Sequence, residues 1–390
     1  MWKHVASNAL TLLIVGLVAV GGVIAWARAS YETAGPLTEA ICVQVESGSN
    51  MRRVSQNLAE RGAIDHPQIM RIGANYTDRS NLLKAGSFLV EEGASMREIV
   101  DIVTGDGQST CGTEIVYRIG VTGQELRVRE LDPTTNQFDV VAQFDPVAEE
   151  DTPEIYAELR GQPDTRYRIA VAEGVTSWQV VAALNAADFM ADEIPAVPQE
   201  GVLAPDSYEV REGASRVDLL ARMQEAQSLR LAQAWEGRDA DLPYDTPEEA
   251  LIMASIVEKE TGVPDERRQV ASVFVNRLNS GMRLQTDPTV IYGITNGEGV
   301  LGRGLRRSEL QASTAYNTYT IDGLPPTPIA NPGFESIQAA LDPDETDFLF
   351  FVADGSGGHA FARTLSEHNE NVARWRTIEA ERASEAETSN

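Results

Sequence analysis

The feature that most constrains the fold is an apolar stretch near the start of the chain. No charged residue occurs from Val5 to Ala27, and a run of this length can cross the hydrocarbon core of a bilayer as a helix. Lys3 precedes the run and Trp26 can lie at the membrane surface, so we expect a cytoplasmic N-terminus. A cleaved signal peptide is the alternative, because residues 25–27 resemble a small-x-small cleavage site. The length of the run favours an uncleaved anchor over residues 1–28.

No second stretch this long and apolar follows, which predicts that the rest of the chain lies on one side of the membrane. A net charge of −27 would repel phosphate backbones and excludes a nucleic-acid partner. The four histidines are too scattered for a zinc cluster, although His359 and His368 could pair with carboxylates. Cys42 and Cys111 could form a disulfide in an oxidising compartment or remain two buried thiols.

Two parts of the chain repeat one pattern of strand, helix, strand and helix. Residues 43–58 align with residues 169–184, and each segment passes from alternating apolar residues through a glycine turn into helical spacing. Further along, residues 87–95 match residues 207–215, and each again enters a helix-like stretch. The chain is therefore predicted to contain a duplicated βα module.

Between the two copies lies a segment with its own β-strand pattern. Apolar residues alternate over 114–121 and 138–144, so residues 108–165 are predicted to form a β-rich insert. The part from 146 to 162 is acidic and rich in turn residues, which indicates a linker or mobile arm. The last residues, 378–390, are polar and are expected to be frayed or solvated.

The sequence pattern changes at Thr246, where a new helix is predicted to begin. Residues 246–249 form a capping box with proline at the first helical position, which predicts a helix through about Glu260. Pro264 follows the end of that helix and can begin another one that runs up to Gly281. The remainder is dense in short turns, a texture that suits a cleft-bearing catalytic domain.

The predicted helix carries two carboxylates near its C-terminal end. Glu258 and Glu260 lie about 200° apart around the axis, so they cannot flank one bond together. Glu260 continues the apolar face of Met253, Ile256 and Val257. Partial burial and the negative end of the helix dipole would raise its pKa, as a general acid requires. By these criteria alone, a solvated glutamate at a fraying helix end remains the alternative.

Two later stretches, 281–293 and 316–319, combine hydrogen-bonding side chains with aromatic rings. Sugars are bound by such combinations, although tyrosines packed in the core and a turn capped by aspartate would explain the same residues. Asp287 is also the candidate if a second carboxylate faces Glu260. The candidate substrate contacts are Glu258, Gln285, Asp287, Tyr292, Tyr316, Asn317 and Tyr319.

With these residues assembled, the chain resembles the MltG-like (YceG-like) endolytic murein transglycosylases. The resemblance is carried by blocks in one order between Leu251 and Arg374, which are residues 254–261, 270–278, 281–293, 316–319, 323–326 and 367–369. Upstream, the repeat resembles the LysM-like region of the family more loosely, including residues 200–208. The insert departs from the shorter family members.

The resemblance implies an enzyme of the cell inner membrane with its catalytic domain in the periplasm. It would cleave between N-acetylmuramic acid and N-acetylglucosamine in nascent peptidoglycan glycan strands, leave 1,6-anhydro ends and terminate glycan elongation. The family's catalytic glutamate falls on Glu260. One carboxyl group suffices because no water is activated, and no metal or organic cofactor is required. Peptidoglycan synthases are candidate partners, and a non-catalytic peptidoglycan-binding scaffold and a hydrolase are the alternatives.

The predicted fold class is α+β. Its predicted parts are a cytoplasmic tip and transmembrane helix at 1–28, a LysM-like βα module at 40–107, a β-rich insert with an acidic linker at 108–165, a second βα module at 166–225, a mixed α/β catalytic domain at 240–377 and a polar tail at 378–390.

Overall fold

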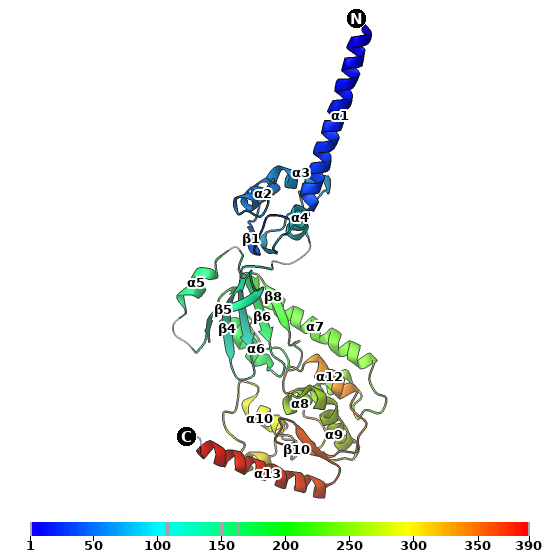
Figure 1. The fold of residues 1–390 in the computed structure, drawn as a ribbon. Helices are drawn as coiled ribbons and strands as arrows, with labels where there is room; N and C mark the ends of the chain where they lie inside the picture. Colours follow the sequence, from blue (N-terminus) through cyan, green and yellow to red (C-terminus); the bar gives the residue numbers. More distant parts are fainter. Residues whose placement is uncertain (1, 106–109, 149–151, 163, 389–390) are drawn as a thin grey trace. The chain divides into compact units, whose positions relative to one another are not determined.

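The computed structural model describes residues 2–105, 110–148, 152–162 and 164–388 (Figure 1). It is a mixed α+β protein, as predicted. Its contacts divide the chain into two compact units, which are described separately. One unit comprises Met1–Ile115, Arg127–Gln143 and Thr152–Arg166, and the other comprises Val116–Leu126, Phe144–Asp151 and Tyr167–Asn390.

The predicted N-terminal helix is confirmed as α1 (Trp2–Glu32). Its portion from Leu10 to Glu32 is long and apolar enough to cross a membrane. The helix does not end at residue 28, because it continues to Glu32 and buries the side chain of Tyr31 in the core of the first unit. The apolar helix and the module that follows are therefore packed against each other.

The first copy of the repeat follows α1 directly. Its two strands are antiparallel, with Val43 opposite Phe88, and its core holds Leu58, Met70 and Ile99. Its elements are β1 (Ile41–Val45), α2 (Met51–Glu60), α3 (Pro67–Tyr76), β2 (Gly86–Val90) and α4 (Met96–Thr104). The open question of the two cysteines is resolved, since Cys42 and Cys111 form a disulfide with their Cα atoms 5.5 Å apart.

The second copy repeats the first in order and in register. Ile169 lies opposite Tyr208, which are the positions aligned with Val43 and Phe88. The turn glycines Gly48 and Gly174 both have a φ of 76°, a left-handed conformation that glycine adopts without steric cost. The elements of the second copy are β6 (Arg166–Val171), α6 (Ser177–Ala186), β8 (Ser207–Val210) and α7 (Arg216–Glu236). The predicted duplication is confirmed, whereas the likeness of its modules to LysM stays a prediction.

The two copies differ in the segment that joins the first helix of each copy to its second strand. The first copy has α3 there, whereas the second has the short strand β7 (Met190–Ala191), which pairs in parallel with β9 (Ala214–Ser215).

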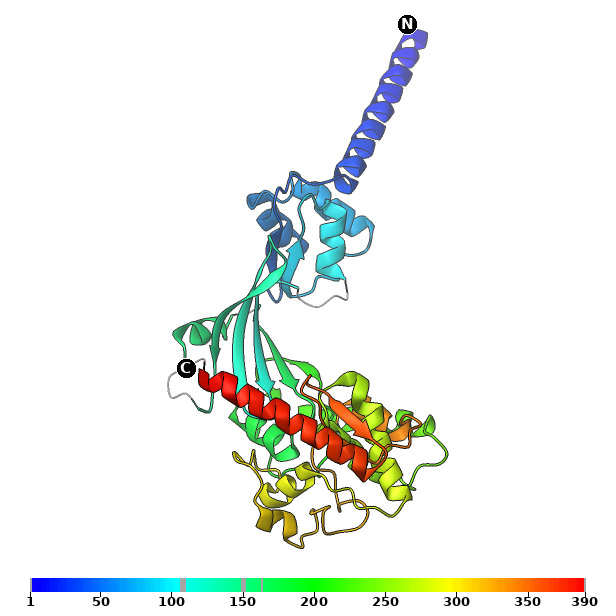
Figure 2. The ribbon, with the colours of Figure 1, turned by 60° about the horizontal axis from the view of Figure 1, so that its bottom comes forward.

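The predicted strands of the insert are present, but they do not form a lobe of their own. β3 (Thr113–Ile119), β4 (Gln124–Asp132) and β5 (Gln137–Phe144) continue the strands of the second copy in the order β5-β4-β3-β6-β8 (Figure 2). The predicted linker or mobile arm over residues 146–162 contains a packed helix. Residues 154–159 form helix α5 (Glu154–Leu159), in which Tyr156 and Leu159 are buried.

The remaining elements belong to the second unit and surround α8 (Pro247–Glu260). The predicted capping box of α8 is confirmed, because the Thr246 side chain accepts the Glu249 N–H and the Glu249 carboxylate accepts the Thr246 N–H. The elements after α8 are η1 (Pro264–Glu266), α9 (Arg267–Asn279), α10 (Asp287–Thr295), α11 (Arg307–Gln311), α12 (Phe334–Leu341), β10 (Phe350–Ala353), β11 (His359–Ala362) and α13 (Leu365–Thr388). The predicted boundary of a polar tail at residue 378 lies inside α13, which is helical through Thr388.

Candidate active site

Glu260 is the last residue of α8 and lies where the buried face of that helix reaches the surface. Met253, Ile256 and Val257 on the same face are fully buried. The hydroxyl of Thr286, a buried residue just before α10, donates a hydrogen bond to Glu260 Oε1. The carboxyl group is therefore held in a fixed position at the end of an apolar surface.

The surroundings of Glu260 favour its protonated form. Burial is the largest influence and raises its pKa, because the charged form loses its hydration. The Thr286 hydrogen bond lowers the pKa, the charge of Asp287 raises it, and His359 and Arg277 lower it by smaller amounts. The resulting pKa is above the ordinary value for glutamate. Such a carboxyl group can donate a proton at a pH where most glutamates are ionised.

Two predicted site residues form a pair beside this carboxyl group. The Tyr319 hydroxyl donates to Asp287 Oδ1 at 2.7 Å, and burial is the main cause that raises the pKa of Tyr319. Asp287 is the first residue of α10 and is exposed to solvent. Gln285 is also exposed, and its φ of 50° forms the turn that leads into Thr286. Gln285 and Asp287 thus flank Thr286, which bonds to Glu260, and present hydrogen-bonding side chains that a ligand can reach.

A buried cation approaches the carboxyl group from α9. Arg277 donates its Nε–H to the Leu349 carbonyl oxygen at 2.7 Å and a second N–H to the Leu284 carbonyl. Burial lowers the pKa of Arg277, whereas the charge of Glu260 raises it. The sequence did not single out Arg277 or Thr286, although both lie in the blocks that carried the family resemblance. Nothing in the sequence around Thr286 or Arg277 indicates that these two side chains face the end of α8.

Glu258 lies away from this site. Its Oε2 accepts hydrogen bonds from the Gly333 N–H at 3.1 Å and from the Ser336 hydroxyl at 2.7 Å. These donors belong to the start of α12, where backbone N–H groups lack partners inside the helix and favour a negative charge. Glu258 therefore caps a neighbouring helix, a role that differs from the substrate contact expected for it.

Asn317 also differs from its expected role. It is fully buried, and its side-chain N–H groups donate to the carbonyl oxygens of Glu309, Leu310 and Ala312. Its Oδ1 accepts the Tyr319 N–H at 3.0 Å. Asn317 thus holds the loop that carries Tyr319 and is not presented to a ligand.

Tyr292 and Tyr316 are half-buried and pack together, with ring centroids 5.1 Å apart. The Tyr316 hydroxyl shares a hydrogen bond with the Thr327 hydroxyl at 2.8 Å. The Tyr292 hydroxyl donates to Glu200 Oε2 at 3.2 Å. Both hydroxyls thus have partners within the protein, which leaves parts of the rings as the surfaces a sugar could contact.

Glu200 was not predicted as a functional residue, and it connects the second copy of the repeat to α10. Its Oε1 accepts the N–H of Ser177 at 2.7 Å, at the start of α6. Burial raises the pKa of Glu200, and the hydrogen bonds from Ser177 and Tyr292 lower it. Next to it, the Thr176 hydroxyl donates to the Gly297 carbonyl oxygen at 2.6 Å, just beyond the end of α10. The second copy therefore holds one end of α10, while the other end begins next to Thr286.

His359 and His368 each contact groups within the second unit. His359 Nδ1 lies 2.8 Å from Glu266 Oε2, so the expected alternative of a pairing with a carboxylate is confirmed for this residue. His368 stacks on Phe350 with ring centroids 5.2 Å apart, and burial lowers its pKa.

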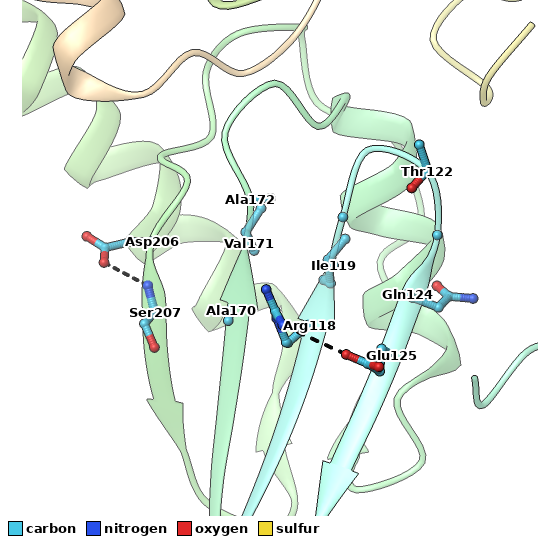
Figure 3. Close-up of a pocket in the computed structure, with 12 residues that line it drawn as sticks. Arg118, Ile119, Thr122, Gln124, Glu125, Ala170, Val171, Ala172, Asp206 and Ser207 are labelled. Atoms are coloured by element: carbon cyan, nitrogen blue, oxygen red, sulfur yellow. Dashed lines mark hydrogen bonds and ion pairs between the residues drawn. The ribbon is translucent and has the colours of Figure 1, made fainter. Parts of the chain in front are cut away.

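A cavity of about 510 Å³ lies elsewhere in the second unit, at one end of the sheet (Figure 3). It is bounded by the turn between β3 and β4, the end of β6 and the start of β8. Arg118 and Glu125, on the neighbouring strands β3 and β4, form an ion pair of 3.8 Å in its lining. No predicted site residue lines this cavity, so it is distinct from the surroundings of Glu260.

Comparison with known families gives a match over residues 142–374, to the model described as the YceG-like family. The chain belongs to the YceG-like family. The matched region begins in β5 and ends in α13, so it contains every candidate site residue. Helix α1 and the first copy of the repeat lie outside the region that this YceG-like match covers.

The chain is also similar to curated proteins named endolytic murein transglycosylase. One, from Bacillus subtilis (strain 168), is 37% identical over 172 residues, which cover 44% of this chain and 46% of that protein. Another, from Streptococcus pneumoniae serotype 2 (strain D39), is 26% identical over 344 residues, covering 85% of this chain and 58% of that protein. The chain thus spans about half the length of these relatives. A crystal structure of a yceG-like protein from Listeria monocytogenes matches with a TM-score of 0.43 and 24% identity over 85% of this chain and 98% of that one.

Proposed function

We propose that this protein is an endolytic peptidoglycan lytic transglycosylase with Glu260 as its acid and base. The observation that carries the proposal is the position of Glu260, a half-buried carboxyl group with a raised pKa at the end of a buried helix face. Membership of the YceG-like family and the names of the curated relatives support the same activity.

The proposed reaction needs one carboxyl group in two protonation states. Protonated Glu260 donates its proton to the glycosidic oxygen between N-acetylmuramic acid and N-acetylglucosamine, and that bond breaks. The resulting carboxylate then accepts the proton of the muramyl 6-hydroxyl as O6 forms a bond to the anomeric carbon. The products are a free 4-hydroxyl on one fragment and a 1,6-anhydro end on the other, and Glu260 is protonated again.

The other polar groups of the site have supporting roles in this proposal. The hydroxyl of Thr286 orients the carboxyl group, and Arg277 stabilises the carboxylate that forms after proton transfer. Gln285, Asp287 and Tyr319 are the proposed contacts to the sugar, together with the exposed parts of the Tyr292 and Tyr316 rings.

The position of Asp287 keeps a hydrolase as a second candidate. Ordinary glycosidases use two carboxylates on either side of the bond, one of which activates water or attacks the sugar. The charge of Asp287 acts on Glu260, so a second carboxylate is available. A hydrolase would release reducing muramyl ends in place of anhydro ends.

The location and partners follow from the same proposal. Helix α1 would hold the enzyme in the cell inner membrane as a single-pass protein, with the remaining chain in the periplasm among nascent glycan strands. The two strand-helix repeats would act as LysM-like modules that retain the glycan. Peptidoglycan synthases are the proposed neighbours, because they produce the strands that the enzyme would end.

Digestion of uncrosslinked glycan strands by the full chain in detergent, followed by mass spectrometry, tests the activity. Glu260→Gln is expected to lower the rate about a thousandfold, within the range that acid–base catalysis contributes. Glu258→Gln is the matched control, since it makes the same change two residues away where the carboxylate caps α12. It is expected to keep most of the cleavage activity.

The products decide between the candidates. Anhydromuramyl ends that disappear in Glu260→Gln would establish the transglycosylase, and products heavier by one water would indicate the hydrolase. A folded wild-type chain that cleaves no strand but remains bound to purified sacculi would replace both enzymes with a non-catalytic scaffold.

A further inference from the structure

The apolar helix α1 packs directly on the first copy of the repeat. The ring of Tyr31, near the end of α1, is buried in the module core. It lies against the backbone of α3 so closely that a Cβ atom on Gly73 would be 2.3 Å from the ring. The rings of Trp26 and His66 are also in contact, with centroids 5.2 Å apart. Helix α3 is therefore fixed to the last turns of α1.

These contacts set the depth of α3 when α1 spans a bilayer. Trp26 ends the apolar run, and tryptophan at such a position lies at the membrane surface. His66, which precedes α3 and touches Trp26, lies at the same level. The five helical steps from Trp26 to Tyr31 advance about 7.5 Å. The headgroup layer extends about 5–7 Å beyond the hydrocarbon core, so α3 lies in this layer or at its edge.

The outer side of α3 carries apolar side chains that the protein does not cover. Ile72 and Tyr76, one helical turn apart, are 68% and 91% exposed, and Leu82 just beyond the helix is 52% exposed. Met70 and Ala74 on the inner side are fully buried. Among the described residues from 33 to 105, these three are the only large apolar or aromatic side chains with such exposure. Isolated exposed apolar residues are common, but here all of them fall within one short segment.

We propose that Ile72, Tyr76 and Leu82 insert into the headgroup region of the same bilayer that α1 spans. A helix with an apolar outer side at this depth gains stability by burying that side between the lipid headgroups, as interfacial helices do. The first copy is then docked on the membrane surface, and its orientation relative to the bilayer is fixed at two places, α1 and α3. This inference rests on the membrane-spanning role proposed for α1, and it is independent of the chemistry at Glu260.

Single-cysteine labelling of the full chain tests this docking. The two native cysteines are joined in a disulfide, so a fluorophore would react with an introduced cysteine alone. Three sites are informative: Val18→Cys within the apolar helix, Tyr76→Cys on α3, and Ser47→Cys as the control. The start of β1 lies at the end of the module that is near α1, because Ile41 pairs with Val90 and the turn after Val90 bonds to Gly35, just beyond α1. Ser47 follows the opposite end of β1 and is exposed.

The labelled chains would be reconstituted in vesicles of phosphatidylethanolamine and phosphatidylglycerol that carry nitroxide quenchers at headgroup depth or deep in the acyl chains. We expect the label at position 76 to be quenched by headgroup nitroxides at least about twofold more than the label at position 47. The label at position 18 should be quenched by deep nitroxides. Ile72→Asp should reduce the quenching at position 76 and leave position 18 unchanged.

Three results would overturn the proposal. Equal quenching at positions 76 and 47, with position 18 in the lipid, would show that α3 stays in water while the anchor is correct. A label at 76 that is shielded from water but not quenched by lipid nitroxides would show that a protein covers the patch. Absence of quenching at position 18 would remove the anchor itself, and the strand-cleavage assay would remain interpretable.

Discussion

The two copies of the repeat have the same framework and different surroundings. In both, a strand, a left-handed glycine turn and a capped helix follow each other, and the strand pairs in the same register with the second strand of the copy. The first copy packs on the apolar helix α1 and is closed by a disulfide. The second copy continues into a five-stranded sheet and holds α10 through Thr176 and Glu200.

The same small module therefore packs on the apolar helix α1 in one place and, in the other, holds the helix that begins next to Thr286. The aligned cap residues illustrate it. Asn50 and Thr176 both accept the N–H of the third residue of their helix, at 3.1 Å and 3.2 Å. The Thr176 hydroxyl also donates to the Gly297 carbonyl oxygen, which lies outside its own helix. This hydrogen bond at an equivalent position, together with the one from Tyr292 to Glu200, ties the second copy to the helix that begins next to Thr286.

The largest expected effect concerns the disulfide of the first copy. Replacing Cys42 and Cys111 with serine opens a loop of 69 residues, and the chain-entropy model attributes about 4 kcal/mol to a loop of this size. Hydrogen exchange resolved along the chain should show the loss in the first unit. Glycan cleavage by the remaining folded protein should be unchanged. A parallel loss of protection around α8 and α10 would contradict the separate roles of the two copies.

The matched cap variants give the next largest effect and test the comparison directly. Asn50→Ala and Thr176→Ala should each lower the free energy of unfolding by about 1 kcal/mol, because each removes a helix cap. Only Thr176→Ala should also lower kcat, by roughly tenfold, since a small displacement at a catalytic group is costly. KM should change less than kcat, because the residue does not touch the substrate in this proposal. Equal activity in both variants would mean that the second copy does not position α10.

The smallest effect is a pH dependence of stability that originates at Glu260. Burial raises the pKa of Glu260 in the folded protein above the ordinary 4.5 of the unfolded chain. At a pH between the unfolded and the folded pKa, the folded protein therefore binds more protons than the unfolded chain. The free energy of unfolding therefore falls as pH rises through this window. Glu260→Gln removes the contribution, so the variant should match the wild type below pH 4.5 and be more stable than it at higher pH. Thermal unfolding at several pH values measures this difference, and a stability gap independent of pH would contradict it.

Part of the fold was predictable because its signals are local. The apolar run became α1, the capping box at Thr246 began α8, and the duplicated segments became equivalent strands, turns and helices. In the same way, the face of α8 that carries Glu260 followed from helical periodicity alone, and Met253, Ile256 and Val257 are buried as that periodicity requires.

The roles of several polar residues were not predictable for a different reason. Glu258, Asn317 and Glu200 are polar residues of the types that also bind ligands, and their sequence neighbours do not distinguish the two roles. Their partners are the start of α12, three carbonyl oxygens at the end of α11 and a tyrosine of α10, all brought together by packing. The strands of the insert likewise alternate as expected, but alternation does not indicate which sheet a strand joins.

The sequence by itself determined the apolar helix, the duplication, the position of Glu260 on its helix and the resemblance to the YceG-like family, because these depend on spacing along the chain. Only the tertiary structure decided that Thr286 bonds to Glu260, that the charge of Arg277 acts on it, that Cys42 and Cys111 pair, and that the second copy holds α10. The physical reason is that hydrogen bonds and desolvation act between neighbours in space. Which distant residues become neighbours is set by how the whole chain buries its apolar surface.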